Sequence, residues 1–240
     1  MAKNYFYIIS VYILMQFSVF LGVPYLMKQT SLTPFEANGY WSIFSFTIGL
    51  IVILLLMRPA MTKNLDRNAT TASTTIGWII LGVFIAYFTQ FASVWIETMI
   101  LGIKTNSENT AQILELVRAA PLFIVIPALI APILEEVIFR KIIFGSLYKK
   151  TGFFIAALIS AVLFGIIHGE PQHLLIYASM GFVFAYLYVK TKRIIVPIAV
   201  HMTLNSISVI VQYNMSPEDI ERMQRQAEAL QMILVGGSYF

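Results

Sequence analysis

The chain of 240 residues contains no cysteine and few charged residues. Without cysteine it can form neither disulfides nor thiolate metal sites, and it cannot use a cysteine nucleophile. Charged residues make up 12% of the sequence, against about 25% in a soluble domain. No basic stretch is interleaved with aromatic residues, which excludes the usual surface for nucleic acid. Because 58% of the residues are hydrophobic, the composition indicates a polytopic membrane protein.

Long apolar segments recur along the chain. A membrane-spanning helix needs about 20 predominantly apolar residues. Seven segments qualify, at 5–27, 40–57, 75–103, 119–147, 152–168, 172–189 and 194–213. The first exceeds the ~7–15 apolar residues of a signal peptide and lacks a small-residue cleavage site, so we expect an uncleaved span. The predicted fold is an all-α transmembrane helix bundle of about seven spans.

The whole chain, 1–240, is predicted to be one integral-membrane domain. It divides into N-terminal spans (1–118), core spans (119–213) and a tail (214–240). In the tail, Ser216 and Pro217 are typical of a helix start, and apolar residues then recur three and four apart. This pattern predicts an amphipathic surface helix. A dimer contact is the alternative, although the segment is short for a coiled coil.

Basic residues predict the orientation of the bundle. With the N-terminus on the cytoplasmic side, that side collects eleven of the sixteen Lys and Arg residues, and the alternation holds at every loop. Cytoplasmic loops of membrane proteins carry an excess of Lys and Arg. We therefore expect a cytoplasmic N-terminus.

The fourth apolar segment carries charges at membrane depth. Glu135 and Glu136 follow an apolar run, and Arg140 comes four residues after Glu136. Each such charge costs about 2.5–3.5 kcal/mol on insertion scales, so these groups should face a protein interior or a hydrated cavity. Residues four apart share a helix face, so Arg140 should pair with Glu136 and leave Glu135 free. Pro127 and Pro132 should kink this helix.

Three further polar residues fall in apolar segments. His168 ends the fifth segment, and His201 and Asn205 share one face of the seventh. Glu135, His168 and His201 are a suitable set for a divalent metal, of which zinc, with water in its fourth position, is the leading candidate. Without metal, Glu135 could deprotonate water directly, while His201 and Asn205 donate hydrogen bonds to the oxyanion. The residues leave both mechanisms open.

Each polar residue also has a structural alternative. Histidine and asparagine in spans often join helices by hydrogen bonds, and a Glu–Arg pair is often structural. His173 is expected at a loop or cavity rim without a catalytic role, and Glu97 at the interface or at an entrance. Polar groups of matching chemistry on three helices favour one common site.

The depths of two site residues predict an irregular bundle. At ~1.5 Å per residue, Glu135 lies deep below the outer face, whereas His168 nearly reaches that face. They can meet only if the spans are offset, tilted or bent.

Three motifs in order resemble a known family. They are Glu-Glu-x-x-x-Arg at 135–140, Phe-x-x-x-His at 164–168 and His-x-x-x-Asn at 201–205. Together they resemble the CPBP family of intramembrane proteases, which joins type II CAAX prenyl endopeptidases with bacterial Abi-like bacteriocin-processing and self-immunity proteins. The resemblance covers about 121–212. It implies a catalytic glutamate at Glu135, essential residues at His168, His201 and Asn205, and support from Glu136 and Arg140.

The resemblance implies peptide-bond hydrolysis within or beside the membrane, by metal-bound or glutamate-activated water. The expected partners are the lipid bilayer and a peptide or membrane-protein substrate, with no nucleic acid. The short, loop-poor chain resembles members in bacterial cell membranes that serve bacteriocin maturation, peptide-pheromone processing or immunity. A non-catalytic membrane scaffold or immunity protein is one alternative. A proton-coupled transporter is another, which the lack of internal repeats disfavours.

Overall fold

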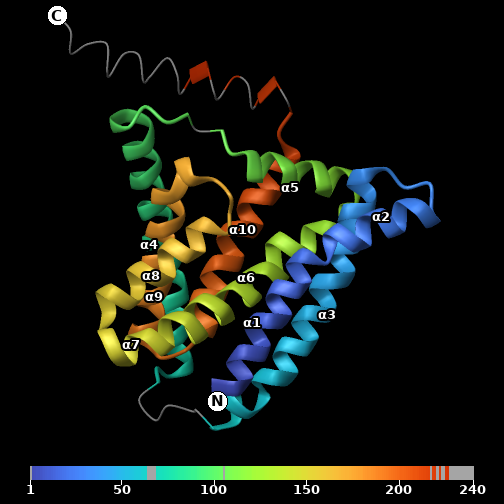
Figure 1. The fold of residues 1–240 in the computed structure, drawn as a ribbon. Helices are drawn as coiled ribbons and strands as arrows, with labels where there is room; N and C mark the ends of the chain where they lie inside the picture. The colour runs from blue at the N-terminus through green and yellow to red at the C-terminus, as the bar shows by residue number, and fades with distance from the viewer. Residues whose placement is uncertain are drawn as a thin grey trace, which may run out of the picture.

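The computed structural model describes residues 2–63, 69–104, 106–216, 218, 219, 222, 225 and 226 (Figure 1). Every regular element in this part of the chain is a helix. Six helices are long and apolar enough to cross a membrane, namely Asn4–Gln29, Pro34–Arg58, Ala72–Ile100, Pro121–Thr151, Pro171–Thr191 and Ile195–Asn214. The predicted all-α polytopic bundle is confirmed.

The fifth predicted span is shorter than the others. It forms α8, Phe153–Ile166, with 14 residues. At ~1.5 Å per residue its length is about 21 Å, less than the ~30 Å of a hydrocarbon core. Gly152 and Gly169 flank it with φ of 79° and 73°, values that favour glycine. The sequence between these two glycines therefore limits the helix to a partial crossing.

The N-terminal helices form one group at the side of the bundle. α1 (Ala2–Phe17) and α2 (Val19–Gln29) make up the first span, which runs beside α3 (Pro34–Lys63) (Figure 1). Gly22 allows close packing here, because a Cβ atom at this position would lie 1.8 Å from the Trp41 ring. The Trp41 indole also donates a hydrogen bond to Ser18 Oγ, at 3.0 Å.

A second group contains α8 and three longer helices. These are α4 (Ala72–Trp95), which continues in a π-helical turn at Ile96–Ile100, α9 (Leu174–Thr191) and α10 (Ile195–Asn214). Phe184, Leu187 and Val200 are among the buried residues that join α4, α9 and α10. α8 and α9 approach closely where Gly181 faces Ala161.

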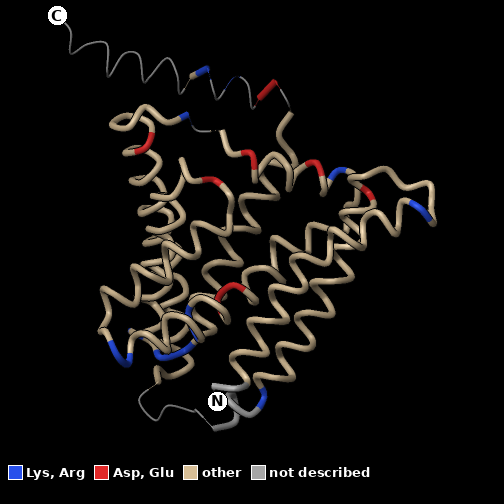
Figure 2. Tube along the Cα trace, viewed as in Figure 1, with Lys and Arg blue, Asp and Glu red and all other residues tan. Residues whose placement is uncertain are grey.

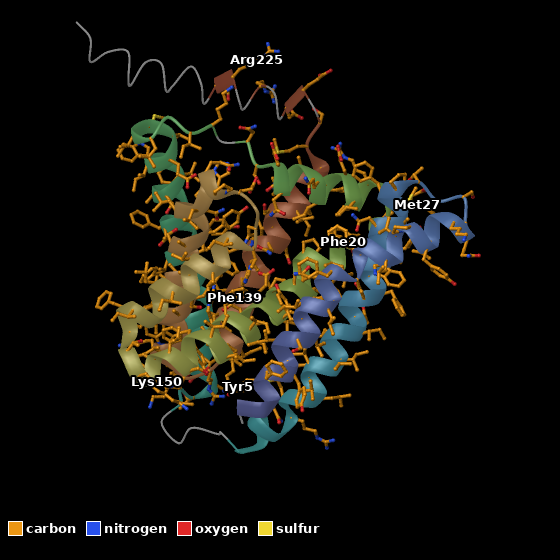
Figure 3. All side chains as sticks on the ribbon, viewed as in Figure 1. Tyr5, Phe20, Met27, Phe139, Lys150 and Arg225 are labelled. Atoms are coloured by element: carbon orange, nitrogen blue, oxygen red, sulfur yellow. The ribbon has the colours of Figure 1, made fainter. Side chains whose placement is uncertain are left out.

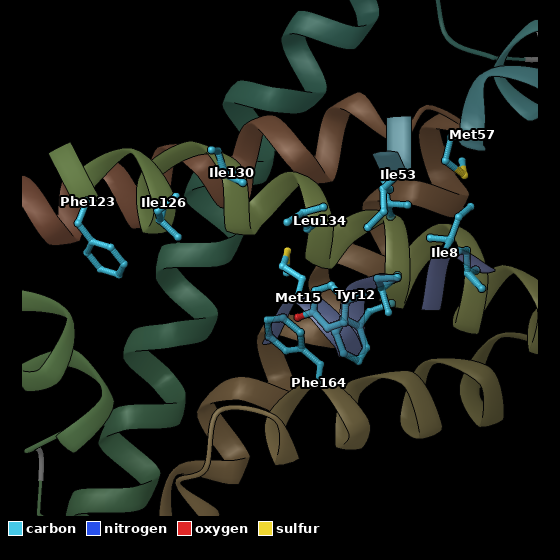
Figure 4. Close-up of a cluster of buried hydrophobic side chains, with 14 of the residues drawn as sticks. Ile8, Tyr12, Met15, Ile53, Met57, Phe123, Ile126, Ile130, Leu134 and Phe164 are labelled. Atoms are coloured by element: carbon cyan, nitrogen blue, oxygen red, sulfur yellow. The ribbon is translucent and has the colours of Figure 1, made fainter. Parts of the chain in front are cut away.

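The segment Pro121–Thr151 lies between the two groups and is the most buried span. Sixty-one per cent of its apolar window is buried, against 17–39% in the other five spans. Figure 4 shows side chains of this segment, including Ile130 and Leu134, beside Tyr12 and Met15 of α1 and Ile53 of α3. The residues with the highest insertion cost therefore lie on the helix that lipid contacts least.

This central segment is not a regular α-helix. It consists of a 3-10 turn at Pro121–Ile124, a π-helix at Ile126–Ile130, α6 (Ala131–Glu135), a second π-helix at Glu136–Phe144 and α7 (Gly145–Thr151). Pro127 and Pro132 each lack an N–H group, and the changes of helix type surround them. π-helical turns occur frequently at functional sites.

One helix was not predicted from the sequence. α5, Glu108–Ala119, is amphipathic and lies across one end of the bundle (Figure 1). Its length of 12 residues and its polar composition give no signal of a span. The signal available in the sequence was Ser107, a typical N-cap residue. In the structure its Oγ accepts a hydrogen bond from the Thr110 N–H at 3.1 Å.

Charged residues separate along the bundle axis. Figure 2 shows Lys and Arg concentrated at the end that carries the N-terminus, and most acidic residues toward the other end. Figure 3 shows Lys150 at the first end and Met27 at the opposite one. The cytoplasmic N-terminus stays a prediction. In the tail, Ser216 Oγ accepts from the Asp219 N–H at 3.1 Å, as expected of an N-cap, and most of the predicted amphipathic helix lies outside the described residues.

We predict that Gly181→Ala destabilises the bundle. The new Cβ would lie 2.8 Å from the Ala161 Cα atom, and overpacking of this kind costs about 1–3 kcal/mol. The thermal unfolding midpoint of detergent-purified protein should fall. Gly77→Ala is the matched control, because no atom lies within 4 Å of its Cβ position. Equal midpoints for the two variants would contradict this account of the α8–α9 contact.

Candidate active site

A fully buried ion pair lies at the centre of the site. Arg140 Nε is 3.1 Å from Glu136 Oε2, and both side chains have no exposed surface. The predicted pairing of these two residues is confirmed. The Arg140 guanidinium also lies over the rings of Phe164 and Phe184, at 4.5 and 5.2 Å. These aromatic faces stabilise a cation removed from water.

His201 joins this pair from α10. Its Nδ1 lies 3.1 Å from Glu136 Oε1, and because an ionised carboxylate only accepts, Nδ1 carries the proton. The ring stacks on Phe184, with centroids 4.8 Å apart. Glu136 thus has a partner on each oxygen and a fixed orientation.

Glu135 is placed differently from its neighbour. Its Oε2 lies 3.7 Å from His201 Nε2, and its side chain is 13% exposed while that of Glu136 is fully buried. The distance exceeds that of a direct hydrogen bond. As predicted, the two adjacent glutamates point to different surroundings, and Glu135 keeps an oxygen available for another group.

His168 is held from two sides. Its Nδ1 donates to the Phe164 carbonyl oxygen at 2.7 Å, and its ring stacks on Tyr177 with centroids 4.1 Å apart. The Phe164 ring lies 4.7 Å from the His168 ring and 5.9 Å from the His201 ring. Phe164 therefore connects His168 to the Glu136–Arg140 pair, which gives the first residue of Phe-x-x-x-His a physical role.

The turn at Gly152 explains how Glu135 and His168 reach the same depth. Glu135 precedes Gly152 and His168 follows it by almost the same number of residues. Since the chain reverses direction at this turn, equal distances along two antiparallel helices give similar depths. The central helix continues beyond the apolar run to Thr151, so the turn lies at Gly152, between the two predicted segments.

Asn205 and Ser206 compensate for a missing backbone donor. Pro132 has no N–H, so it cannot donate to the carbonyl groups four and five residues earlier, at Ala128 and Pro127. Asn205 Nδ2 donates to Pro127 O at 3.1 Å, and Ser206 Oγ donates to Ala128 O at 3.4 Å. α10 thereby holds the helix that carries the glutamates. This hydrogen bond between helices is the structural role considered for Asn205 as the alternative to a catalytic one. A contact of Asn205 with the oxyanion stays a prediction.

The predicted metal ligands have suitable donor atoms. In His168 and His201 a fixed acceptor holds Nδ1, which leaves Nε2 as the ligand atom, as in many metal sites. However, within the described part of the chain no three His, Cys, Asp or Glu residues are grouped closely enough to hold a metal ion. Metal binding by Glu135, His168 and His201 stays a prediction.

A second buried polar network lies beside the site. His173 Nδ1 is 2.8 Å from Glu97 Oε2, and His173 Nε2 is 3.1 Å from Asn106 O. The other Glu97 oxygen accepts from the Ile176 N–H at 3.2 Å. Glu97 and His173 are 1% and 5% exposed. His173 lies in the short connection before α9, as expected, and an interfacial or entrance position for Glu97 stays a prediction. Each group has a partner distant in sequence, which makes its burial possible.

Glu170 belongs to the same region. Its Oε2 accepts from Ser107 Oγ at 2.9 Å and from the Tyr177 hydroxyl at 2.6 Å, and its Oε1 accepts from the Asn109 N–H at 3.1 Å. Burial tends to raise the pKa of this carboxyl, but the three hydrogen bonds outweigh it and hold the pKa below the ordinary 4.5. Sequence reasoning missed this residue, because its partners lie on other elements.

Comparisons with known proteins agree with the site. Residues 117–207, which contain all the predicted site residues, match the protein-family model described as type II CAAX prenyl endopeptidase Rce1-like. The chain is 44% identical to the putative membrane peptidase YdiL of Bacillus subtilis over the full length of both proteins. It is 30% identical to the membrane-embedded CAAX protease MroQ of Staphylococcus aureus, over 95% of this chain and 96% of that protein.

A third relative, the UPF0177 protein YxdF of Lactococcus lactis, is 31% identical over 65% of this chain and 86% of its own length. No solved structure matches the chain. The full-length similarity to two membrane peptidases, together with the family match across the site, determines the classification. This chain belongs to the Rce1-like family of type II CAAX prenyl endopeptidases.

Proposed function

We propose that this protein is an intramembrane endopeptidase that cleaves a membrane-associated or small peptide with Glu135 as the general base. The observation that carries the proposal is the difference between the two glutamates. Glu136 is fully buried and bound by Arg140 and His201, whereas Glu135 faces His201 Nε2 across 3.7 Å. Membership of the family and the names of the two long relatives support the reaction class.

A single water that bridges Glu135 and His201 would be the attacking nucleophile. His201 Nδ1 donates to Glu136, so its Nε2 is an acceptor in the neutral ring, and Glu135 is an acceptor when ionised. Two acceptors 3.7 Å apart are both satisfied by one water that donates to each. Glu135 takes a proton as the water oxygen forms a bond to the scissile carbonyl carbon. When the carbon–nitrogen bond breaks, Glu135 returns this proton to the leaving amine.

We assign His168 and Asn205 to stabilise the negative charge that develops on the carbonyl oxygen of the scissile bond. Because the Phe164 carbonyl accepts from His168 Nδ1, Nε2 is the ring nitrogen left to contact the substrate oxygen, and it donates there when the ring is protonated. Asn205 uses one amide hydrogen for Pro127 O and retains a second for the same oxygen. Donors fixed before the reaction stabilise such charge without reorganisation.

Direct activation of water by Glu135 is favoured here over activation by zinc. The metal alternative requires Glu135, His168 and His201 around one ion, and the described residues contain no such compact set. If a metal is bound, these three residues would hold it, and it would acidify the water.

The substrate class follows from the membrane location of the site. MroQ is named as a CAAX protease, and a peptide with a hydrophobic end would reach Glu135 from the bilayer. Bacteriocin maturation, peptide-pheromone processing and self-immunity are the roles proposed for such cleavage, in a bacterial cell membrane with a cytoplasmic N-terminus.

Glu135→Gln should abolish cleavage without loss of fold. The amide retains the shape of the side chain but cannot accept the proton, so kcat should fall by about 100-fold or more. Purified protein in lipid nanodiscs would be assayed with hydrophobic quenched-fluorescence peptides, with and without a prenyl group. Glu115→Gln on α5 is the matched control. Unchanged cleavage by Glu135→Gln would defeat the assignment and favour a non-catalytic scaffold.

Exhaustive chelation should leave the activity intact, because the proposed base is a carboxylate. The same assay, run after dialysis against a strong zinc chelator, and metal analysis of the purified protein provide the measurement. Loss of cleavage that added zinc restores, with about one metal ion per chain, would replace this mechanism by the metal-bound alternative.

Arg140→Met should destabilise the protein severely. The substitution leaves Glu136 buried without its ion-pair partner, and breaking a buried pair on one side costs about 3–5 kcal/mol. The double variant Glu136→Gln/Arg140→Met removes both charges and should recover much of the thermal midpoint. Equal midpoints for the single variant and the unmodified protein would show that the pair contributes nothing to the fold.

A further inference from the structure

Contacts within its own segment do not fully fix the orientation of the His168 ring. His168 follows the end of α8 and precedes Gly169, whose φ is 73°. The residue therefore lies in a turn rather than in a regular helix. One contact, from Nδ1 to Phe164 O, fixes the hydrogen-bonded edge of the ring. This hydrogen bond alone does not stop the His168 ring from rotating about the Nδ1–oxygen direction, so packing has to limit that rotation.

Tyr177 supplies this packing from α9. Its ring lies nearly parallel to the His168 ring, at an interplanar angle of 23° and a centroid distance of 4.1 Å. Close approach of the two helices is possible because Gly165 has no Cβ atom, which would lie 2.4 Å from Leu174 and 3.4 Å from the Tyr177 Cβ. The stack restricts His168 to one plane.

The Tyr177 ring is itself fixed at its far end. Its hydroxyl donates to Glu170 Oε2 at 2.6 Å, and Glu170 is 4% exposed. Ser107 and Asn109, at the start of α5, hold the same carboxylate. The orientation of Tyr177 therefore depends on a buried anion with three donors.

A second contact fixes the backbone of the first turn of α9, which carries Tyr177. Glu97 accepts from the Ile176 N–H, one residue before Tyr177, and its other oxygen contacts His173. Two buried carboxylates thus act on the first turn of α9. Burial of a carboxylate is costly even when it is paired, so a purely structural role is a weak explanation for two of them beside one residue.

We propose that Tyr177 is a positioning residue for His168, and that Glu170 acts through the Tyr177 hydroxyl to hold the two rings parallel. The inference rests on the proposed function, because it takes His168 as the group that contacts the substrate oxygen. It adds α5 to the elements that determine the geometry of the site. The proposal assigns Tyr177 and Glu170 no contact with the attacking water or the substrate.

The test compares four variants with the unmodified full chain in nanodiscs. Tyr177→Leu removes the stack, Tyr177→Phe keeps the ring and removes the hydroxyl, and Glu170→Gln weakens the anchor. Tyr186→Leu is the matched control on α9, since Tyr186 is 42% exposed. Tyr177→Leu should lower kcat by about 10–100-fold, as small misplacements of catalytic groups do, with KM little changed. Tyr177→Phe should restore most of this loss, and Glu170→Gln, which only weakens the same hydrogen bond, should lower kcat no more than Tyr177→Phe does.

Histidine NMR gives a readout that does not depend on activity. The chain has three histidines, so selective isotope labelling with His168→Gln as the assignment standard identifies the His168 ring signals. Tyr177→Leu should shift these signals, because the stacked ring is lost, and should leave those of His201 in place. Tyr177→Phe should keep the His168 signals near their original position, and it serves as the decisive variant if Tyr177→Leu does not fold.

The proposal is overturned if Tyr177→Leu has the kcat of Tyr186→Leu, whether or not the His168 signals move. It is also overturned if the signals stay in place while kcat falls, because the loss then has another origin. Failure of the proposed function is distinguishable, since it would show as full cleavage by Glu135→Gln. In that case the NMR comparison still decides whether Tyr177 orients the His168 ring.

Discussion

The structure depends on one buried interaction, the contact of Glu136 with Arg140 and His201. Charged groups are costly inside a membrane protein, and this chain has few of them. Part of the cost is offset because the carboxylate has an ion-pair or hydrogen-bond partner at each oxygen and the guanidinium lies against aromatic rings. Among the described residues, Arg140 Nη1 and Nη2 have no hydrogen-bond partner. With Glu136 held by Arg140 and His201, Glu135 is the carboxylate left for chemistry. The same contact joins α10 to the central segment, so the charges that seem unfavourable for a membrane helix also assemble the site.

Irregular backbone is the second constraint. Two prolines and two π-helical stretches interrupt the central segment, and Pro132 leaves carbonyl groups without intrahelical donors. Asn205 and Ser206 of α10 satisfy them. In the low-dielectric interior an unsatisfied carbonyl is expensive, so these side chains both permit the irregularity and fix the register of α10 against it. His201 on the same helix is thereby placed opposite the glutamates.

Much of this arrangement follows from the sequence, because it depends on local spacing. The pairing of Glu136 with Arg140 and the separation of Glu135 come from the four-residue repeat of a helix, and the spans come from apolar length. Of the features that were missed, the buried carboxylates depend on contacts distant in sequence. Hydropathy could not show that α8 stops short of a full crossing or that α5 is a helix. The burial of Glu97, Glu170 and His173 could not be predicted, because their partners lie more than 60 positions away in most contacts.

The central claim is that one glutamate holds the site and the adjacent glutamate activates water. A cryo-electron microscopy map of the protein in nanodiscs, at a resolution that shows ordered water, tests it most directly. We expect a water within hydrogen-bonding distance of both Glu135 Oε2 and His201 Nε2, and Glu136 in contact with Arg140 and shielded from solvent. Density for a metal ion between Glu135, His168 and His201, or a water bound by Glu136 instead, would contradict the account.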